Sequence, residues 1–100
     1  MSWAKYSKEA LARGETVQIR PKGNSMRGRI NSGDLVTIEP CDPANLVPGD
    51  IVLVRVSGRD YVHLVSARDG DRIQISNNHG HVNGWVGPGA VYGRVSGVSP

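Results

Sequence analysis

A serine in a glycine-flanked loop is the first residue of this sequence whose surroundings could support chemistry. Ser25 lies between Gly23 and Gly28, just after Pro21 ends an alternating stretch. The glycines leave the backbone free to approach a substrate carbonyl and to adopt turn conformations that other residues avoid. A serine hydroxyl is a weak nucleophile at neutral pH and needs a base and oxyanion donors. Because glycine-flanked serines are common in turns, this loop alone indicates a site only weakly.

The order of several short motifs makes the pattern more specific. They are Gly23-Asn24-Ser25-Met26, Ile30, Ser32-Gly33-Asp34-Leu35-Val36, Pro48-Gly49-Asp50-Ile51-Val52, Tyr61-Val62-His63 and the stretch from Ile73 to Asn78. Over residues 15–96 this order resembles the superfamily shared by LexA-type repressors and type I signal peptidases. The resemblance implies a mainly β fold, a small folded sheet or barrel, in which Ser25 attacks a peptide carbonyl. It also implies that Gly23, Asn24 and Met26 form the oxyanion and substrate loop, with Met26 packed beneath the nucleophile.

The same resemblance assigns the general base to His63. Most of that superfamily uses a lysine kept neutral by burial, but no lysine follows Lys22 in this chain. Signal peptidases of the endoplasmic-reticulum kind are similar in carrying histidine there. An imidazole with a pKa near 6.5 is a competent base at pH 7. A structural histidine that binds a loop is the alternative interpretation.

The acidic partner expected of a histidine-type relative is missing. The matching position reads Ser76, or Asn77 if the alignment shifts by one, and neither is a carboxylate. A neutral partner can hold a histidine tautomer, but it stabilises the imidazolium less than a carboxylate does. We therefore predict a slow Ser25-His63 dyad.

Most other polar residues fit structural roles. Asp34 and Asp50 each follow a glycine before an apolar run, which is typical of side chains that accept backbone N–H groups in turns. Cys41 is the only cysteine, so no intramolecular disulfide can form, and the neighbouring Asp42 would raise its pKa. We interpret Cys41 as a free thiol.

The later loop contains two histidines and a tryptophan. His79 and His81 would share a face of an extended segment, but a metal site usually needs a third or fourth ligand. We predict neither a metal nor another cofactor. Asn83-Gly84-Trp85 has the composition of a turn, with Trp85 covering the core.

Length and composition predict one small domain dominated by strands. The chain has 100 residues, 13 Gly, 6 Pro and no Phe, and its apolar bulk is mostly Val, Ile and Leu. Trp3, Tyr6, Ala10 and Leu11 fall at helical spacing, Ser2 could cap, and Gly14 can end the helix. We therefore expect a helical segment over residues 1–14 and a β domain over 15–100.

Alternating apolar residues predict six strands within that β domain. They cover residues 15–20, 35–38, 51–56, 61–65, 73–75 and 90–98. The third and fourth should form an antiparallel hairpin across a turn at residues 57–60, with a second turn at 68–71. Residues 77–88 are expected to form an irregular loop.

Charge and hydropathy limit the partners. The net charge is +3, and residues 1–29 hold seven Lys or Arg against Glu9 and Glu15. Few aromatics accompany this basic end, Trp3 and Tyr6 among them, which disfavours nucleic-acid binding. The longest apolar run, residues 51–54, is too short for a membrane span, and the first twelve residues lack the apolar core of a signal peptide. We expect a soluble cytoplasmic protein.

Two functional hypotheses follow. The first is a soluble serine endopeptidase that cuts a protein or peptide partner in trans with Ser25 and His63. The second is a catalytically silent regulatory or interaction module of phage or mobile-element origin, favoured by the missing lysine and acid but not by the retained serine. The alternating strand at residues 90–98, together with the resemblance, also predicts a homodimer.

Overall fold

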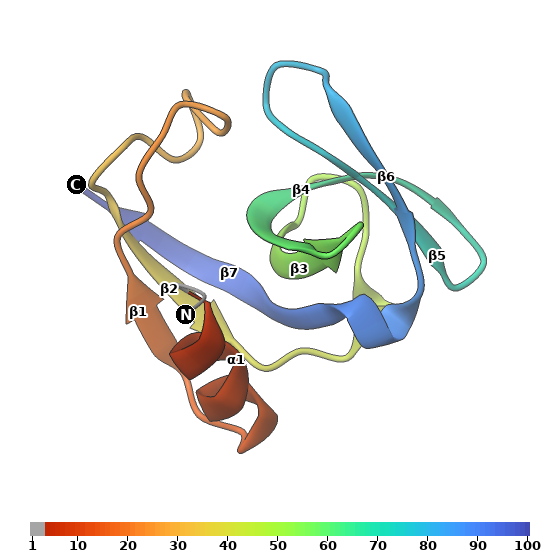
Figure 1. The fold of residues 1–100 in the computed structure, drawn as a ribbon, viewed down its shortest axis with the longest axis horizontal. Helices are drawn as coiled ribbons and strands as arrows, with labels where there is room; N and C mark the ends of the chain where they lie inside the picture. Colours follow the sequence, from red (N-terminus) through yellow and green to blue (C-terminus); the bar gives the residue numbers. More distant parts are fainter. Residues whose placement is uncertain (1–3) are drawn as a thin grey trace.

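A single antiparallel sheet forms most of the molecule. The computed structural model describes residues 4–100, so the expected cap at Ser2 and the side chain of Trp3 lie outside the described residues. The described chain has seven strands: β1 Val17–Ile19, β2 Leu35–Glu39, β3 Ile51–Val56, β4 Arg59–Asp69, β5 Arg72–Ser76, β6 Val82–Val86 and β7 Val91–Ser99. Their order is β1-β2-β7-β3-β4-β5-β6 (Figure 1). The prediction of a mainly β fold is confirmed.

One short helix, α1 Lys5–Ala12, covers part of the sheet beside β1 and β7 (Figure 1). Its buried face consists of Ser7, Ala10 and Leu11. Gly14 ends the helix with a φ of +82°, and its N–H donates to the Leu11 carbonyl, as a left-handed helix end requires. Tyr6 is 72% exposed, because the buried face is centred about 100° away on the helix surface. No helix in residues 4–100 is long and apolar enough to cross a membrane.

The β3–β4 hairpin closes more tightly than the sequence predicted. Val56 pairs with Arg59, so the turn is the dipeptide Ser57-Gly58 rather than residues 57–60. Both residues have positive φ, +50° and +82°, as a two-residue hairpin turn of type I′ requires. Strand β4 is correspondingly longer than expected and continues to Asp69, which pairs with Arg72 of β5. The turn between β4 and β5 is therefore residues 70–71 rather than the expected 68–71.

Strand β4 changes neighbours along its length. Residues 59–64 pair with β3, whereas pairing with β5 begins only at Leu64 and contains a register shift between Val65 and Ala67. Residues 61–63 are therefore paired with a strand on one side only among the described strands. This one-sided stretch ends at His63, where β4 passes from one neighbour to the other.

Strand β6 corrects the prediction of an irregular loop over residues 77–88. Its residues pair with β5, and Ser76 lies opposite Val82 while Ile75 lies opposite Gly84. Asn83 is the extra residue between these pairs, which makes the irregularity a β-bulge. Val86 fills the core, but Trp85 is 41% exposed, so the prediction that Trp85 covers the core was wrong. The bulge and Gly84 interrupt the alternation by which a strand is recognised.

Two hydrophobic clusters form the core. The first contains Met26 and Ile30 from the Ser25 loop, together with Ala4, Ala10, Leu11, Val17, Val36, Ile38, Leu53 and Val62. The second contains Leu46, Val52, Val54, Val56, Val65, Ile73, Ile75 and Val86. Strand β3 contributes Leu53 to one cluster and Val52 and Val54 to the other, because successive side chains alternate between faces. The loop that carries Ser25 is thus anchored directly in the core.

Gly93 permits a close approach at the middle of the sheet. Strand β7 pairs with both β2 and β3, and a Cβ at Gly93 would lie 2.7 Å from the Glu39 carbonyl oxygen and 2.9 Å from Ile38 Cγ2. We expect Gly93→Ala to lower the free energy of unfolding by about 1–3 kcal/mol, because backbone and core must shift. Thermal denaturation measures this. Gly97→Ala on the same strand, where the nearest atom is 4.0 Å away, is the control. Equal melting temperatures for the two variants would contradict the prediction.

Candidate active site

The Ser25 loop is held by a buried methionine and by short backbone turns. Met26 is 4% exposed, and its carbonyl accepts the Ile30 N–H at 2.8 Å. The Gly23 N–H donates to Ser32 Oγ at 3.3 Å, and Gly23 has a φ of +115° that favours glycine. Ser25 itself is exposed. The loop therefore fixes its backbone internally and presents the serine hydroxyl to solvent.

A second loop braces the first from outside. The Asn78 backbone N–H donates to the Ser25 carbonyl at 2.8 Å, and its side-chain amide donates to the Arg27 carbonyl at 2.9 Å. Arg29 Nε donates to Asn78 Oδ1 at 2.7 Å. His79 Nε2 lies 2.7 Å from the Asn24 carbonyl oxygen and must donate to it. Asn78 thus fixes the nucleophile loop through three contacts.

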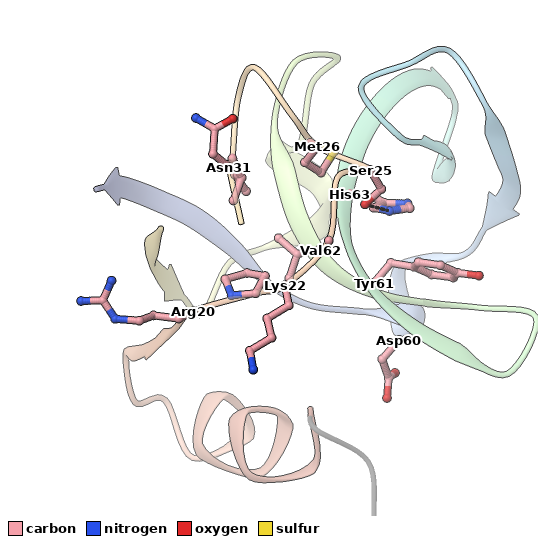
Figure 2. Close-up of a pocket in the computed structure, with 12 residues that line it drawn as sticks. Arg20, Lys22, Ser25, Met26, Asn31, Asp60, Tyr61, Val62 and His63 are labelled. Carbon is pink, nitrogen blue, oxygen red and sulfur yellow. Dashed lines mark hydrogen bonds between the residues drawn. The ribbon is translucent and has the colours of Figure 1, made fainter. Parts of the chain in front are cut away.

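The structure brings Ser25 and His63 together. His63 Nε2 lies 3.1 Å from Ser25 Oγ, within hydrogen-bond distance (Figure 2). Strand β4 supplies the histidine and the loop between β1 and β2 supplies the serine, 38 positions apart in the sequence. A hydroxyl next to an imidazole nitrogen is the arrangement that activates a serine nucleophile.

The other ring nitrogen of His63 is held by Asn83. His63 Nδ1 lies 2.7 Å from Asn83 Oδ1, and because a carbonyl oxygen only accepts, Nδ1 carries the proton. Nε2 is then left with its lone pair toward Ser25, as a general base requires. The resemblance matched the acidic partner to Ser76 or Asn77, whereas the residue at His63 Nδ1 is Asn83. Asn77 Oδ1 accepts instead from the backbone N–H groups of His79 and His81.

Burial keeps the His63 base neutral. The residue is 5% exposed, and the Tyr61 ring packs against the imidazole with a centroid distance of 4.6 Å. Desolvation lowers the pKa of His63 below its ordinary value, the Asn83 hydrogen bond acts in the opposite direction, and His81 lowers the pKa further. The imidazole is therefore unprotonated at neutral pH and able to accept the serine proton.

A cleft of about 530 Å³ leads to the Ser25-His63 pair. One wall comes from residues 20–23 with Ser25 and Met26, and the other from residues 60–63, with Ile30 and Asn31 also in the lining. Figure 2 shows Lys22 and Arg20 across from Asp60 and Tyr61, with Ser25 and His63 at one end. Residues 61–63, which pair with β3 but not with β5, line this space.

The remaining predicted residues lie in structural positions. Asp34 accepts the Asn31 N–H at 2.8 Å, and Asp50 accepts the Val47 N–H at 3.0 Å, each within a turn. Cys41 packs beside the second core cluster, and burial raises the pKa of its thiol. Within residues 4–100, no three His, Cys, Asp or Glu side chains gather closely enough to hold a metal ion.

Comparison with known families decides the relationship. A family model described as Peptidase S24-like matches residues 3–92. The chain belongs to the Peptidase S24-like family. No curated protein matches the chain significantly. The resemblance to the LexA and signal-peptidase superfamily is thereby confirmed, and the match spans the segments that carry Ser25, His63 and Asn83. This S24-like domain has a histidine within reach of its serine and an asparagine behind the histidine.

Proposed function

We propose that this S24-like domain is a serine peptidase that cleaves a peptide bond in a protein partner, with Ser25 as nucleophile and His63 as base. The observation that carries the proposal is the pair of His63 contacts, 3.1 Å to Ser25 Oγ and 2.7 Å to Asn83 Oδ1. Together they give the imidazole the tautomer and orientation that serine activation needs.

In the proposed reaction, His63 moves a proton twice. Nε2 takes the Ser25 hydroxyl proton as Oγ bonds to the substrate carbonyl carbon, and the carbonyl oxygen becomes an oxyanion. The imidazolium then gives this proton to the leaving amine as the peptide C–N bond breaks. Water, activated by the same nitrogen, hydrolyses the acyl-serine. Asn83 holds Nδ1–H throughout and supplies no charge, so the reaction should be slow.

The Ser25 loop offers backbone donors for the oxyanion. Within residues 4–100, neither the Ser25 N–H nor the Met26 N–H donates an internal hydrogen bond. Backbone N–H groups beside the nucleophile are suitable oxyanion donors because they are fixed before the charge develops. Gly23 and Asn24 precede these donors in the same loop.

We assign the substrate an extended conformation along β4. Residues 61–63 pair with β3 on one side, and their other side borders the cleft beside Ser25. A peptide added there as a further strand would gain main-chain hydrogen bonds irrespective of its sequence. A carbonyl group of this peptide would then lie beside the Ser25 hydroxyl.

Covalent labelling tests the proposal. We expect an alkyl fluorophosphonate to modify Ser25 in the wild type and to leave Ser25→Ala unmodified, because only an activated serine displaces fluoride. Intact mass and peptide mapping measure this, and Ser96→Ala, an exposed serine on β7, is the matched control. Equal modification of wild type and Ser25→Ala would contradict the proposal. Absence of labelling from both would favour the silent interaction module.

A further inference from the structure

We propose that the cleft selects peptides that carry carboxylates beside the scissile bond. This inference rests on the proposed peptidase function and names the substrate class. It starts from the charge around the cleft. From Thr16 to Gly33 the chain has four cations and no Asp or Glu. Two of the four, Arg20 and Lys22, line the cleft, and all four are exposed.

The position of Arg20 is fixed rather than free. Its Nη1 donates to the Gly33 carbonyl at 2.8 Å, which holds the guanidinium at the rim with other N–H groups still available. Lys22 lies on the same wall, closer to the Ser25-His63 pair (Figure 2). A peptide laid in the cleft along β4 would therefore face a wall that carries both cations.

The single carboxylate in the cleft lining does not offset this charge. Asp60 has a side chain only 4% exposed, and its Oδ2 accepts from Lys8 Nζ of α1 at 3.0 Å. Arg55 Nη1 lies 3.7 Å from the other oxygen. Its negative charge is therefore compensated inside the protein, and a substrate meets the positive charge of the opposite wall.

The rest of the cleft suits a peptide better than a nucleic acid. Its lining includes the apolar side chains of Met26, Ile30 and Val62, and a strand edge lies beside it. Proteins that bind single-stranded nucleic acids combine a positively charged groove with several aromatic side chains on which successive bases stack. The aromatic ring in this lining, Tyr61, has one face against His63. An acidic peptide matches the charge, the apolar lining and the strand edge together.

Peptidyl phosphonates with matched charges test the preference. The probes are tripeptidyl diphenyl phosphonates whose last residue is an alanine analogue that carries the phosphonate. The two residues before it are both glutamate, both glutamine or both lysine. Ser25 Oγ bonds to phosphorus, phenoxide leaves, and His63 takes the hydroxyl proton. We expect the glutamate probe to modify Ser25 with a second-order rate constant roughly threefold to tenfold that of the glutamine probe, and the lysine probe to react slowest. The factor is modest because each exposed ion pair contributes little free energy. Adding about 0.5 M NaCl should shrink the ratio.

Charge reversal on the cleft wall should change the preference. The glutamate-to-glutamine ratio of each variant is compared, so that changes in overall reactivity cancel. Lys22→Glu should bring the ratio to about one or below, since the carboxylate then repels the glutamate probe. Arg72→Glu, an exposed position at the β4–β5 turn, makes the same charge change and should keep the wild-type ratio. Equal rates for the three probes, or a ratio that survives Lys22→Glu, would overturn the inference.

A binding measurement separates this inference from the peptidase proposal. If no phosphonate modifies Ser25, the peptidase proposal fails, and fluorescence anisotropy with labelled acetylated peptide amides of the same three sequences decides the inference. Stronger binding of the glutamate peptide, lost in Lys22→Glu, supports an acidic-peptide site on a silent domain. Equal binding, no binding, or tighter binding of a thymidine decanucleotide than of the glutamate peptide overturns it.

Discussion

Replacing His63 with glutamine should lower the rate at which a fluorophosphonate modifies Ser25 by roughly a hundredfold to ten-thousandfold, the usual contribution of a positioned general base. His63 Nε2 lies 3.1 Å from Ser25 Oγ, and the histidine residue is 5% exposed. Glutamine has a similar polarity but cannot take up the proton. Labelling kinetics measured by intact mass check the prediction. Labelling of His63→Gln at the wild-type rate would show that another base serves Ser25.

The pH profile should identify His63 as the titrating group. Protonated His63 cannot accept a proton, so the labelling rate should rise with pH and level off once the imidazole is neutral. Because burial lowers the pKa of His63, the inflection should lie below 6.5, the ordinary value. His81→Gln is the control for loss of an imidazole and should retain most of the rate. In His63→Gln this inflection should disappear.

Asn83→Asp should speed the labelling reaction and move its pH inflection upward. A carboxylate in the place of the Asn83 amide would still accept Nδ1–H, and its charge would stabilise the imidazolium and raise the pKa of His63. We expect a gain of roughly tenfold at pH 8, well above the inflection. Asn45→Asp, an exposed asparagine at the 3-10 turn Pro43–Asn45, is the matched control and should change neither quantity.

Asn83→Leu should have the opposite effect. It removes the acceptor and leaves the buried Nδ1–H without its 2.7 Å hydrogen bond, at a cost of about 1–3 kcal/mol. The imidazole also loses the contact that selects its tautomer, so we expect labelling to fall roughly tenfold to a hundredfold. If Asn83→Asp and Asn83→Leu both labelled at the wild-type rate, Asn83 would be a packing residue and not a positioning residue.

Much of the fold could be predicted because its signals are local. Alternating apolar residues mark β2, β3 and β7, and Gly14 marks the end of α1. The errors arose where backbone geometry breaks the alternation. Ser57 has a positive φ, which is uncommon for serine and could not be predicted from its residue type. The bulge at Asn83-Gly84 breaks the alternation in β6, so this strand was not predicted.

The candidate site was predictable in part for the same reason. Ser25 and His63 lie in short motifs with a recognisable order, whereas the role of Asn83 depends on a bulge that directs its side chain toward a strand two positions away in the sheet. No local pattern shows that direction. Ser76, which the sequence suggested, lies opposite Leu64 on β4 and is buried.

Strand β6 is the last of the described strands in the sheet, so the residue that orients His63 sits on an element that pairs, among those strands, with β5 alone. Edge elements open locally at a lower free energy than strands in the middle of a sheet. Separation of β6 from β5 would release Asn83 while Ser25 and His63 stayed anchored in the core. Heating would then stop the labelling of Ser25 at a temperature at which the rest of the sheet is still folded, so loss of labelling and thermal unfolding would be separate events.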